Sequence, residues 1–276
     1  MHAIITVAQK ELLDAVRNRW IISVAVVLAL LAVGIAWFGA AASGQVGFVS
    51  LSSTLASLSS LAVVIIPLIA LLMAYDALVG EAERGTLLLL LSYPLSRYQL
   101  LLGKLLGQGS ALFLATFSGF SVAAIIMGVL GDQTDWPALI KGFLLLISSA
   151  SLLGWIFIAF ALLFSSLVVE KSRAAAAALL GWLFFVIIFD LGLLGILVMS
   201  QGQLDSEVFP WLMLLNPTDL FRLVNLQYLG DMKMLGGVLA TASSASFSIV
   251  FLFSVMLGWL VSLTGLSLWI FGRKHI

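Results

Sequence analysis

The sequence predicts an all-α integral membrane protein with six transmembrane helices. Hydrophobic residues make up 62 % of the 276-residue chain, and its mean hydropathy is +1.20. Several apolar runs are long enough to cross about 30 Å of hydrocarbon as helices. Charged residues form only 9 % of the sequence, and they gather between those runs. A soluble fold is thereby excluded, and residues 1–276 are predicted to form a single transmembrane domain.

The first segment, residues 4–19, is predicted to be an amphipathic helix lying in the membrane interface. Its apolar residues recur at spacings of three and four, opposite polar and charged ones: Ile4, Ile5, Ala8, Leu12 and Val16 against Lys10, Asp14, Arg17 and Asn18. A frayed cytoplasmic tail is the alternative. A cleaved signal peptide is disfavoured because the following apolar run is long and the preceding segment contains acidic residues.

Six apolar segments are predicted to span the membrane: residues 20–38, 61–79, 105–130, 143–167, 174–199 and 246–271. Six spans place both termini on one side. Ten of the 13 cations lie in the first segment, the loops after the second and fourth spans, and the tail: Lys10, Arg17, Arg19, Arg84, Arg97, Lys104, Lys171, Arg173, Arg273 and Lys274. Because cations concentrate in cytoplasmic loops, both termini are predicted to be cytoplasmic.

The loop after the second span, residues 76–104, combines charged residues with five consecutive leucines. We expect a cytoplasmic helix over residues 81–92, which ends before Pro94 because a proline pushes the preceding residue out of the helical region. The predicted helix places Arg84, Leu87, Leu88 and Leu91 near one face, which would dock into a partner's groove. The alternative is an interfacial helix that touches only lipid headgroups.

Gly103 and Gly107 form a GxxxG motif at the start of the third span. Two glycines at this spacing let another helix approach the backbone closely. The motif therefore predicts a helix contact at this point.

The region before the last span, residues 205–233, is too polar for a span and too apolar for a solvated loop. Asn216, Pro217 and Asp219 form a helix-stop and helix-start signal. We expect two short helices in the outer leaflet, either re-entrant or packed on the bundle. Asp190 is the one clearly intramembrane carboxylate. It is a candidate polar site, although protonation, pairing with serine or backbone groups, or a place near the interface would also explain it.

No pattern for catalysis or for binding a cofactor is found in the sequence. Cysteine is absent, and the two histidines, His2 and His275, lie at the chain ends, so thiolate and histidine chemistry are excluded. A phosphate-binding GxxxxGK[ST] motif is also absent. The balanced charge argues against nucleic acid as a partner. The methionines Met199, Met213, Met232 and Met234 have soft sulfur atoms that suit Cu(I), but packing explains them better, so no metal site is predicted.

A family resemblance rests on the loop after the second span. The residues that carry it are Glu81, Arg84-Gly85-Thr86-Leu87, Leu90-Leu91, Pro94-Leu95-Ser96-Arg97 and Gly103-Lys104. In combination they resemble the signature of ABC-2-type transporter membrane subunits. The likeness extends over the whole chain and is greatest to the members that serve copper-site maturation of nitrous oxide reductase.

The resemblance implies a homodimer in the bacterial inner membrane that carries two copies of a cytoplasmic ATPase subunit, which binds the ATP and Mg. It also implies a periplasmic β-helical partner. The loop after the second span would dock to the ATPase through Glu81, Glu83, Arg84, Gly85, Thr86, Leu87, Leu88 and Leu91. The loop after the fourth span supplies Glu170, Lys171 and Arg173, and the outer cap contains Asn216, Pro217, Asp219 and Arg222.

Three functions are compatible with these observations. The first is a non-catalytic permease that couples ATP hydrolysis to export, or to a conformational signal for the periplasmic partner. The second is an ABC-2 exporter of an unrelated lipophilic or drug-like compound. The third is an ATP-independent membrane scaffold.

Overall fold

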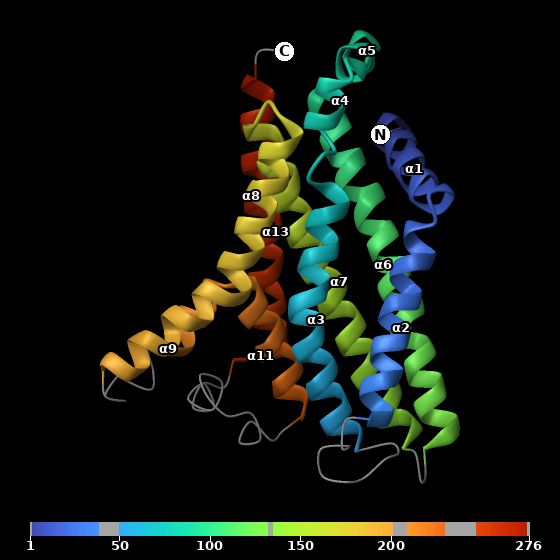
Figure 1. Cartoon of the computed structure of the whole chain (residues 1–276), viewed down its shortest axis with the longest axis vertical. Helices are drawn as coiled ribbons and strands as arrows, with labels where there is room; N and C mark the ends of the chain where they lie inside the picture. The colour runs from blue at the N-terminus through green and yellow to red at the C-terminus, as the bar shows by residue number, and fades with distance from the viewer. Residues whose placement is uncertain (1, 39–49, 132–134, 201–208, 230–246, 275–276) are drawn as a thin grey trace.

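Every regular element that the structure describes is helical (Figure 1). The structure is a computed structural model, and it describes residues 2–38, 50–131, 135–200, 209–229 and 247–274. Within these ranges, six helices are long and apolar enough to cross a membrane. The predicted all-α class with six membrane-spanning helices is confirmed.

The longest elements form the six spans. In chain order they are α2 (Trp20–Phe38), α3 (Leu51–Ala74), α6 (Arg97–Leu130), α7 (Trp136–Leu167), the consecutive helices α8 (Lys171–Leu183), η2 (Phe184–Ile188) and α9 (Phe189–Met199), and finally α13 (Ile249–Arg273). The shorter elements are α1 (His2–Arg17), α4 (Val79–Glu83), α5 (Thr86–Ser92), α10 (Phe209–Met213) and α11 (Pro217–Leu229). α1, α4, α5 and the C-terminal end of α13 lie together at one end of the bundle, called here the cation-rich end (Figure 1).

Two spans begin about ten residues earlier than predicted. α3 includes a serine-rich segment, because a serine hydroxyl can bond to its own helix: Ser60 Oγ donates to the Ala56 carbonyl at 3.1 Å. α6 includes Arg97 because Ser96, the residue before the helix, and Gln99, in its first turn, form a capping box. As a result, the cations Arg97 and Lys104 belong to the same helix as the third span.

The spans differ in how they pack. α7 is the most buried of the six, and the helices around it include α3, α6 and α13. The unit α8–η2–α9 is the least buried, and α9 leaves the bundle at an angle (Figure 1). The change of direction follows the π-helical turn η2, a recognised cause of bends. Asp190 lies in α9, just beyond this turn.

The expected cytoplasmic helix over residues 81–92 is divided in the structure. α4 ends at Glu83, and α5 begins only at Thr86. Gly85 between them has a φ of 71°, a left-handed conformation that glycine adopts without steric cost. The predicted end before Pro94 agrees with the end of α5 at Ser92.

Candidate functional site

The GxxxG motif brings α1 against α6. A Cβ atom at Gly103 would lie 2.5 Å from Val7 Cβ, and one at Gly107 would lie 2.6 Å from the Ala8 carbonyl oxygen. Side chains at these two positions would therefore force α1 away from α6. The predicted helix contact is confirmed, and its partner is the N-terminal helix of the same chain.

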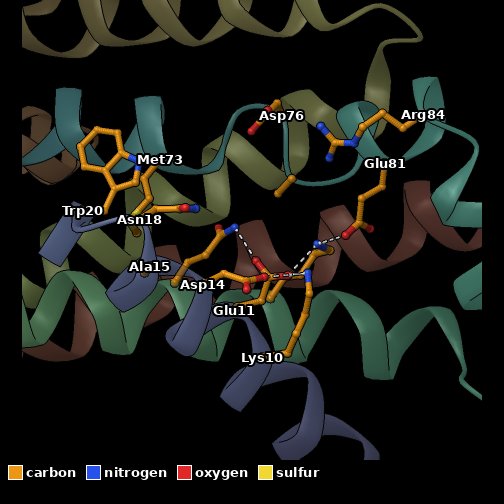
Figure 2. A pocket seen from close by; sticks show the side chains of 13 residues that line it. Lys10, Glu11, Asp14, Ala15, Asn18, Trp20, Met73, Asp76, Glu81 and Arg84 are labelled. Carbon is orange, nitrogen blue, oxygen red and sulfur yellow. Dashed lines mark hydrogen bonds and ion pairs between the residues drawn. The ribbon is translucent and has the colours of Figure 1, made fainter.

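A buried lysine sits where α1, α4 and α6 meet. Lys104 is only 2 % exposed, and its Nζ lies 2.7 Å from Glu81 Oε1 and 3.0 Å from Glu11 Oε1. Gln108, one turn further along α6, donates from Nε2 to the second Glu11 oxygen at 3.2 Å. Figure 2 shows Glu11 and Glu81 reaching this point from different elements. Because a buried charge is tolerated only when it is paired, Lys104 fixes the positions of the other two elements.

The charge environment of Glu11 favours its ionised form. Burial opposes ionisation, but the ammonium groups of Lys104 and Lys10 outweigh that effect and hold the pKa of Glu11 below its ordinary value. Lys10 itself also pairs with Asp14 at 3.2 Å. The carboxylate of Glu11 is therefore charged at neutral pH and available to Lys104.

The leucines of α5 face two ways. Leu87 is 2 % exposed and packs into the core, whereas Leu88 and Leu89 are 59 % and 64 % exposed. Leu91 is half-buried against the core. The expectation that Leu87 shares an outward face with Leu88 is wrong for this chain: consecutive residues are about 100° apart around a helix, and α5 lies with Leu87 toward the core.

The loops after the second and fourth spans are joined by a hydrogen bond and an ion pair at the cation-rich end. Glu83 Oε1 accepts a hydrogen bond from the backbone N–H of Lys171 at 2.6 Å, which places a carboxylate at the start of α8. Lys171 Nζ pairs with Asp76 at 2.7 Å. Glu170 and Arg173 form only an exposed pair at 3.0 Å. Glu83 and Lys171 therefore have structural partners within the chain.

The connection between α3 and α4 is held by α7. Ser165 Oγ, which is buried, accepts hydrogen bonds from the backbone N–H groups of Leu78 and Val79 at 3.1 and 3.0 Å. Thr86 Oγ1 donates to the Glu81 carbonyl at 3.1 Å, across the break at Gly85. Sequence reasoning missed Ser165, because one serine among many in an apolar span gives no separate signal.

Two further cations close the end of the bundle. Arg97 Nη1 donates to the carbonyls of Phe271, Gly272 and Lys274 at 2.9, 3.1 and 2.7 Å. Lys274 Nζ donates to the Ser166 and Val168 carbonyls at 3.0 and 2.6 Å. These carbonyls belong to the C-terminal ends of α13 and α7, where intrahelical donors run out. The Ser-Arg and Gly-Lys pairs of the signature thus have structural roles within the chain.

A second polar cluster surrounds η2. Arg222 Nη1 contacts Asp190 Oδ2 at 2.5 Å and Asp219 Oδ1 at 3.0 Å. Asp190 therefore pairs with a cation, rather than with the serine or backbone groups that the sequence suggested. The sequence did not indicate this partner, because Arg222 lies 32 residues from Asp190, in a region that was not predicted to span the membrane.

The same cluster uses a backbone oxygen of the π-helical turn. Asn216 Nδ2 and Thr218 Oγ1 both donate to the Phe185 carbonyl, at 2.9 and 3.1 Å. Asn216 Nδ2 also donates to Asp219 Oδ2 at 3.0 Å. Pro217 begins α11, a position that suits proline because the first N–H of a helix has no intrahelical acceptor. The predicted cap residues thus meet at one point beside η2, together with Asp190.

Neither cluster has the composition of a metal site. Among the described residues, no group of three or more His, Cys, Asp or Glu side chains could hold a metal ion. Met213 is buried in the core and Met199 is exposed, while Met232 and Met234 lie outside the described residues. The arrangement of the described residues serves to hold helices together.

Comparison with known proteins covers the whole chain. The family model described as "ABC-2 family transporter protein" matches residues 5–276. A protein of Pseudomonas aeruginosa named "Probable ABC transporter permease protein NosY" is 51 % identical over 276 residues, which is 100 % of both chains. A protein of Stutzerimonas stutzeri with the same name is 47 % identical over 274 residues, 99 % of both chains.

Proposed function

Because the chain belongs to the ABC-2 transporter family as a multi-span permease subunit, we propose that it couples ATP hydrolysis by a separate cytoplasmic subunit to work across the bacterial inner membrane. The cation-rich end faces the cytoplasm, since ten of the 13 Lys and Arg residues lie in its loops and tails. ATP and Mg bind to the partner ATPase, and this chain binds neither.

The observation that carries the proposal is the apolar surface of α5. Leu88, Leu89 and Tyr93 are 59 %, 64 % and 69 % exposed, and α5 stands at the tip of the cation-rich end (Figure 1). Apolar and aromatic side chains that project from a charged surface are typical anchors for a partner. They provide the ATPase-docking surface, together with the exposed Glu83, Arg84 and Thr86 beside them.

The structure also supports transmission of a push on this surface. Thr86 of α5 is hydrogen-bonded to Glu81 of α4. α4 is in turn linked to α6 and α1 through Lys104, and to α7 and α8 through Ser165 and Lys171. A force that closure of the ATPase applies to α5 therefore acts on four other helices through bonded contacts. This is the mechanical requirement for coupling in a protein without its own nucleotide site.

The docking surface can be tested by co-purification with the ATPase subunit. We expect the double substitution Leu88→Asp and Leu89→Asp to abolish co-purification and stimulation of ATP hydrolysis, because two charges would replace the apolar anchors. Ser92→Asp is the matched control, since it adds a charge to the same exposed helix without removing an apolar anchor. Survival of assembly and of ATPase stimulation in the leucine variant would show that α5 does not dock.

The physiological role that we propose is copper-site maturation of nitrous oxide reductase, as a homodimer that exports a substrate or signals to a periplasmic β-helical partner. The likeness to the two permeases named NosY supports this choice over the other two functions. Cells lacking this chain should produce the reductase without its copper sites. Normal copper loading would favour an exporter of an unrelated compound, and activity independent of ATP would favour a scaffold.

A further inference from the structure

Two carboxylates share one cation beside the π-helical turn. Arg222 Nη1 contacts both Asp190 Oδ2 and Asp219 Oδ1, so a single guanidinium nitrogen serves the two acids. Asp219 is 1 % exposed, and its other oxygen accepts a hydrogen bond from Asn216. When both acids are ionised, the cluster has one negative charge more than its cation can balance. An unbalanced buried charge costs free energy, and binding one proton removes it.

The helices packed against α11 supply no second cation for these acids. α3 and η2 contain no charged residue. The one charged residue of α7 is Lys141, which lies over the Tyr228 ring further along α11, and the Tyr228 hydroxyl donates to the Ala138 carbonyl. The one charged residue of α13 is Arg273, at the cation-rich end. In the part of the chain that the structure describes, the charge of the cluster is therefore set by its own three side chains.

The protonation state of Asp219 changes near neutral pH. Burial raises the pKa of Asp219 from 3.8 to about 7, the negative charge of Asp190 adds to this rise, and Arg222 opposes it. Because the folded pKa is the higher one, the folded chain holds the proton below about pH 7 and loses it as the pH rises through that value. An isolated, solvated aspartate would lose its proton in acid instead.

The proton enters through the partly exposed members of the cluster. The Asp190 and Arg222 side chains are 26 % and 20 % exposed, whereas Asp219 lies behind them. Asp190 is in the half of the fifth span that lies away from the cation-rich end. With the cation-rich end in the cytoplasm, as proposed above, the cluster exchanges protons with the outer side of the membrane.

The cluster lies at a bend that one polar contact stabilises. Asp190 is in the first turn of α9, directly after η2, and α9 leaves the bundle at this point (Figure 1). Neutral hydrogen bonds from Asn216 and Thr218 hold the Phe185 carbonyl of η2 in place. Beyond η2, the Asp190–Arg222 pair is the one polar side-chain contact from α9 to another helix among the described residues. The strength of that pair therefore decides how closely α9 is held to α11.

From this arrangement we propose that Asp190, Asp219 and Arg222 form a pH-sensitive switch, in which the binding of one proton sets the direction of α9. With the proton on Asp219, Arg222 serves Asp190 alone and holds α9 against α11. When the proton leaves to water, the buried Asp219 carboxylate takes the guanidinium and repels Asp190, so α9 moves away. The switch is a property of this chain and does not depend on the identity of the ATPase or of the transported substrate.

The test is a pH titration of the purified, full-length permease in lipid nanodiscs. Because the chain has no native cysteine, spin labels at Ile196→Cys on α9 and Val250→Cys on α13, both exposed, report the distance between these helices. We expect a short distance in acid and a longer one in base, with equal populations near pH 7. A distance distribution that is unchanged from about pH 5 to about pH 9 would overturn the proposal.

Three variants locate the switch. Asp219→Asn has no acid to titrate, so the short distance should persist at every pH. Asp190→Asn removes a charge that raises the pKa of Asp219, so the infrared band of the protonated carboxyl should disappear about one pH unit lower than in the unaltered chain. Asp135→Asn is the control, since Asp135 is an exposed carboxylate at the start of α7 and asparagine also caps helices.

The control should titrate like the unaltered chain. A pH response that survives in Asp219→Asn would refute the assigned site. If that variant does not fold, the carboxyl band of Asp190→Asn decides in its place: a band that disappears at the same pH as in the unaltered chain would show that Asp190 and Asp219 do not act together.

Discussion

Two regions of the bundle, the cation-rich end and the surroundings of η2, use ion pairs in different ways. At the cation-rich end, Lys104 pairs with acids from two other helices, and α4 is also bonded to α7 and α8. Around η2, Arg222 pairs with one acid of its own helix and one of α9. The first arrangement joins many elements into one unit, whereas the second holds α9 at a single point beside a bend.

This difference matches what the proposed coupling to an ATPase would require. A surface that receives a push must transmit it without deforming, which needs several buried contacts per element. A helix that leaves the bundle at a bend, with one polar contact near it, is free to change direction at little cost. We therefore predict that removing a paired cation lowers the free energy of unfolding more at the cation-rich end than beside η2.

The largest loss of stability is expected for Lys104→Met. It leaves the buried Glu11 and Glu81 carboxylates without their shared cation, and breaking a buried pair in this way typically costs about 3–5 kcal/mol. Thermal unfolding in detergent should show this loss. Lys10→Met is the control, since Lys10 is 56 % exposed and its pairs are worth less than about 1 kcal/mol. Similar melting of the two variants would mean that Lys104 does not hold α1, α4 and α6 together.

A smaller loss of stability is expected for Arg222→Met. Asp219 is buried and loses its cation, but Asp190 is a quarter exposed and Asp219 keeps its hydrogen bond from Asn216, so we expect a cost of about 2 kcal/mol. The direction of α9 should also become less uniform. Because the chain has no native cysteine, spin labels at Val198→Cys and Ile140→Cys would report the α9–α7 distance.

Lys141→Met provides the control for that measurement, since Lys141 is an exposed cation beside the Tyr228 ring and forms no ion pair among the described residues. A broader distance distribution in Arg222→Met than in Lys141→Met is the expected result. If Arg222→Met destabilises the protein more than Lys104→Met does, the ranking of the two regions is wrong.

The sequence was sufficient to predict the existence of the six spans and the helix contact at Gly103 and Gly107, because apolar length and GxxxG spacing are local signals. It was insufficient for the burial of Leu87, since the left-handed Gly85 divides the predicted helix and the side of α5 that faces the core depends on tertiary packing. It was also insufficient for the partners of Lys104 and Asp190. A charged residue within an apolar helix predicts that some partner exists, but the partner's identity depends on helix packing over 23 to 93 residues of separation.

The smallest expected effect, and the one that best separates the two regions, is the pH dependence of the α1–α6 contact. Glu11 has a folded pKa below its ordinary value of 4.5, so its contribution to stability is complete above pH 4.5 and is lost as the pH falls through the folded pKa. The α1–α6 contact should therefore loosen in acid below pH 4.5, which spin labels at Leu13→Cys and Ser110→Cys would detect as a broader distance distribution. Glu11→Gln should be looser at neutral pH and lose this dependence, since its side chain does not titrate. If Glu11→Gln keeps the same pH response, another group controls the contact and Glu11 is not the acid that holds α1 to Lys104.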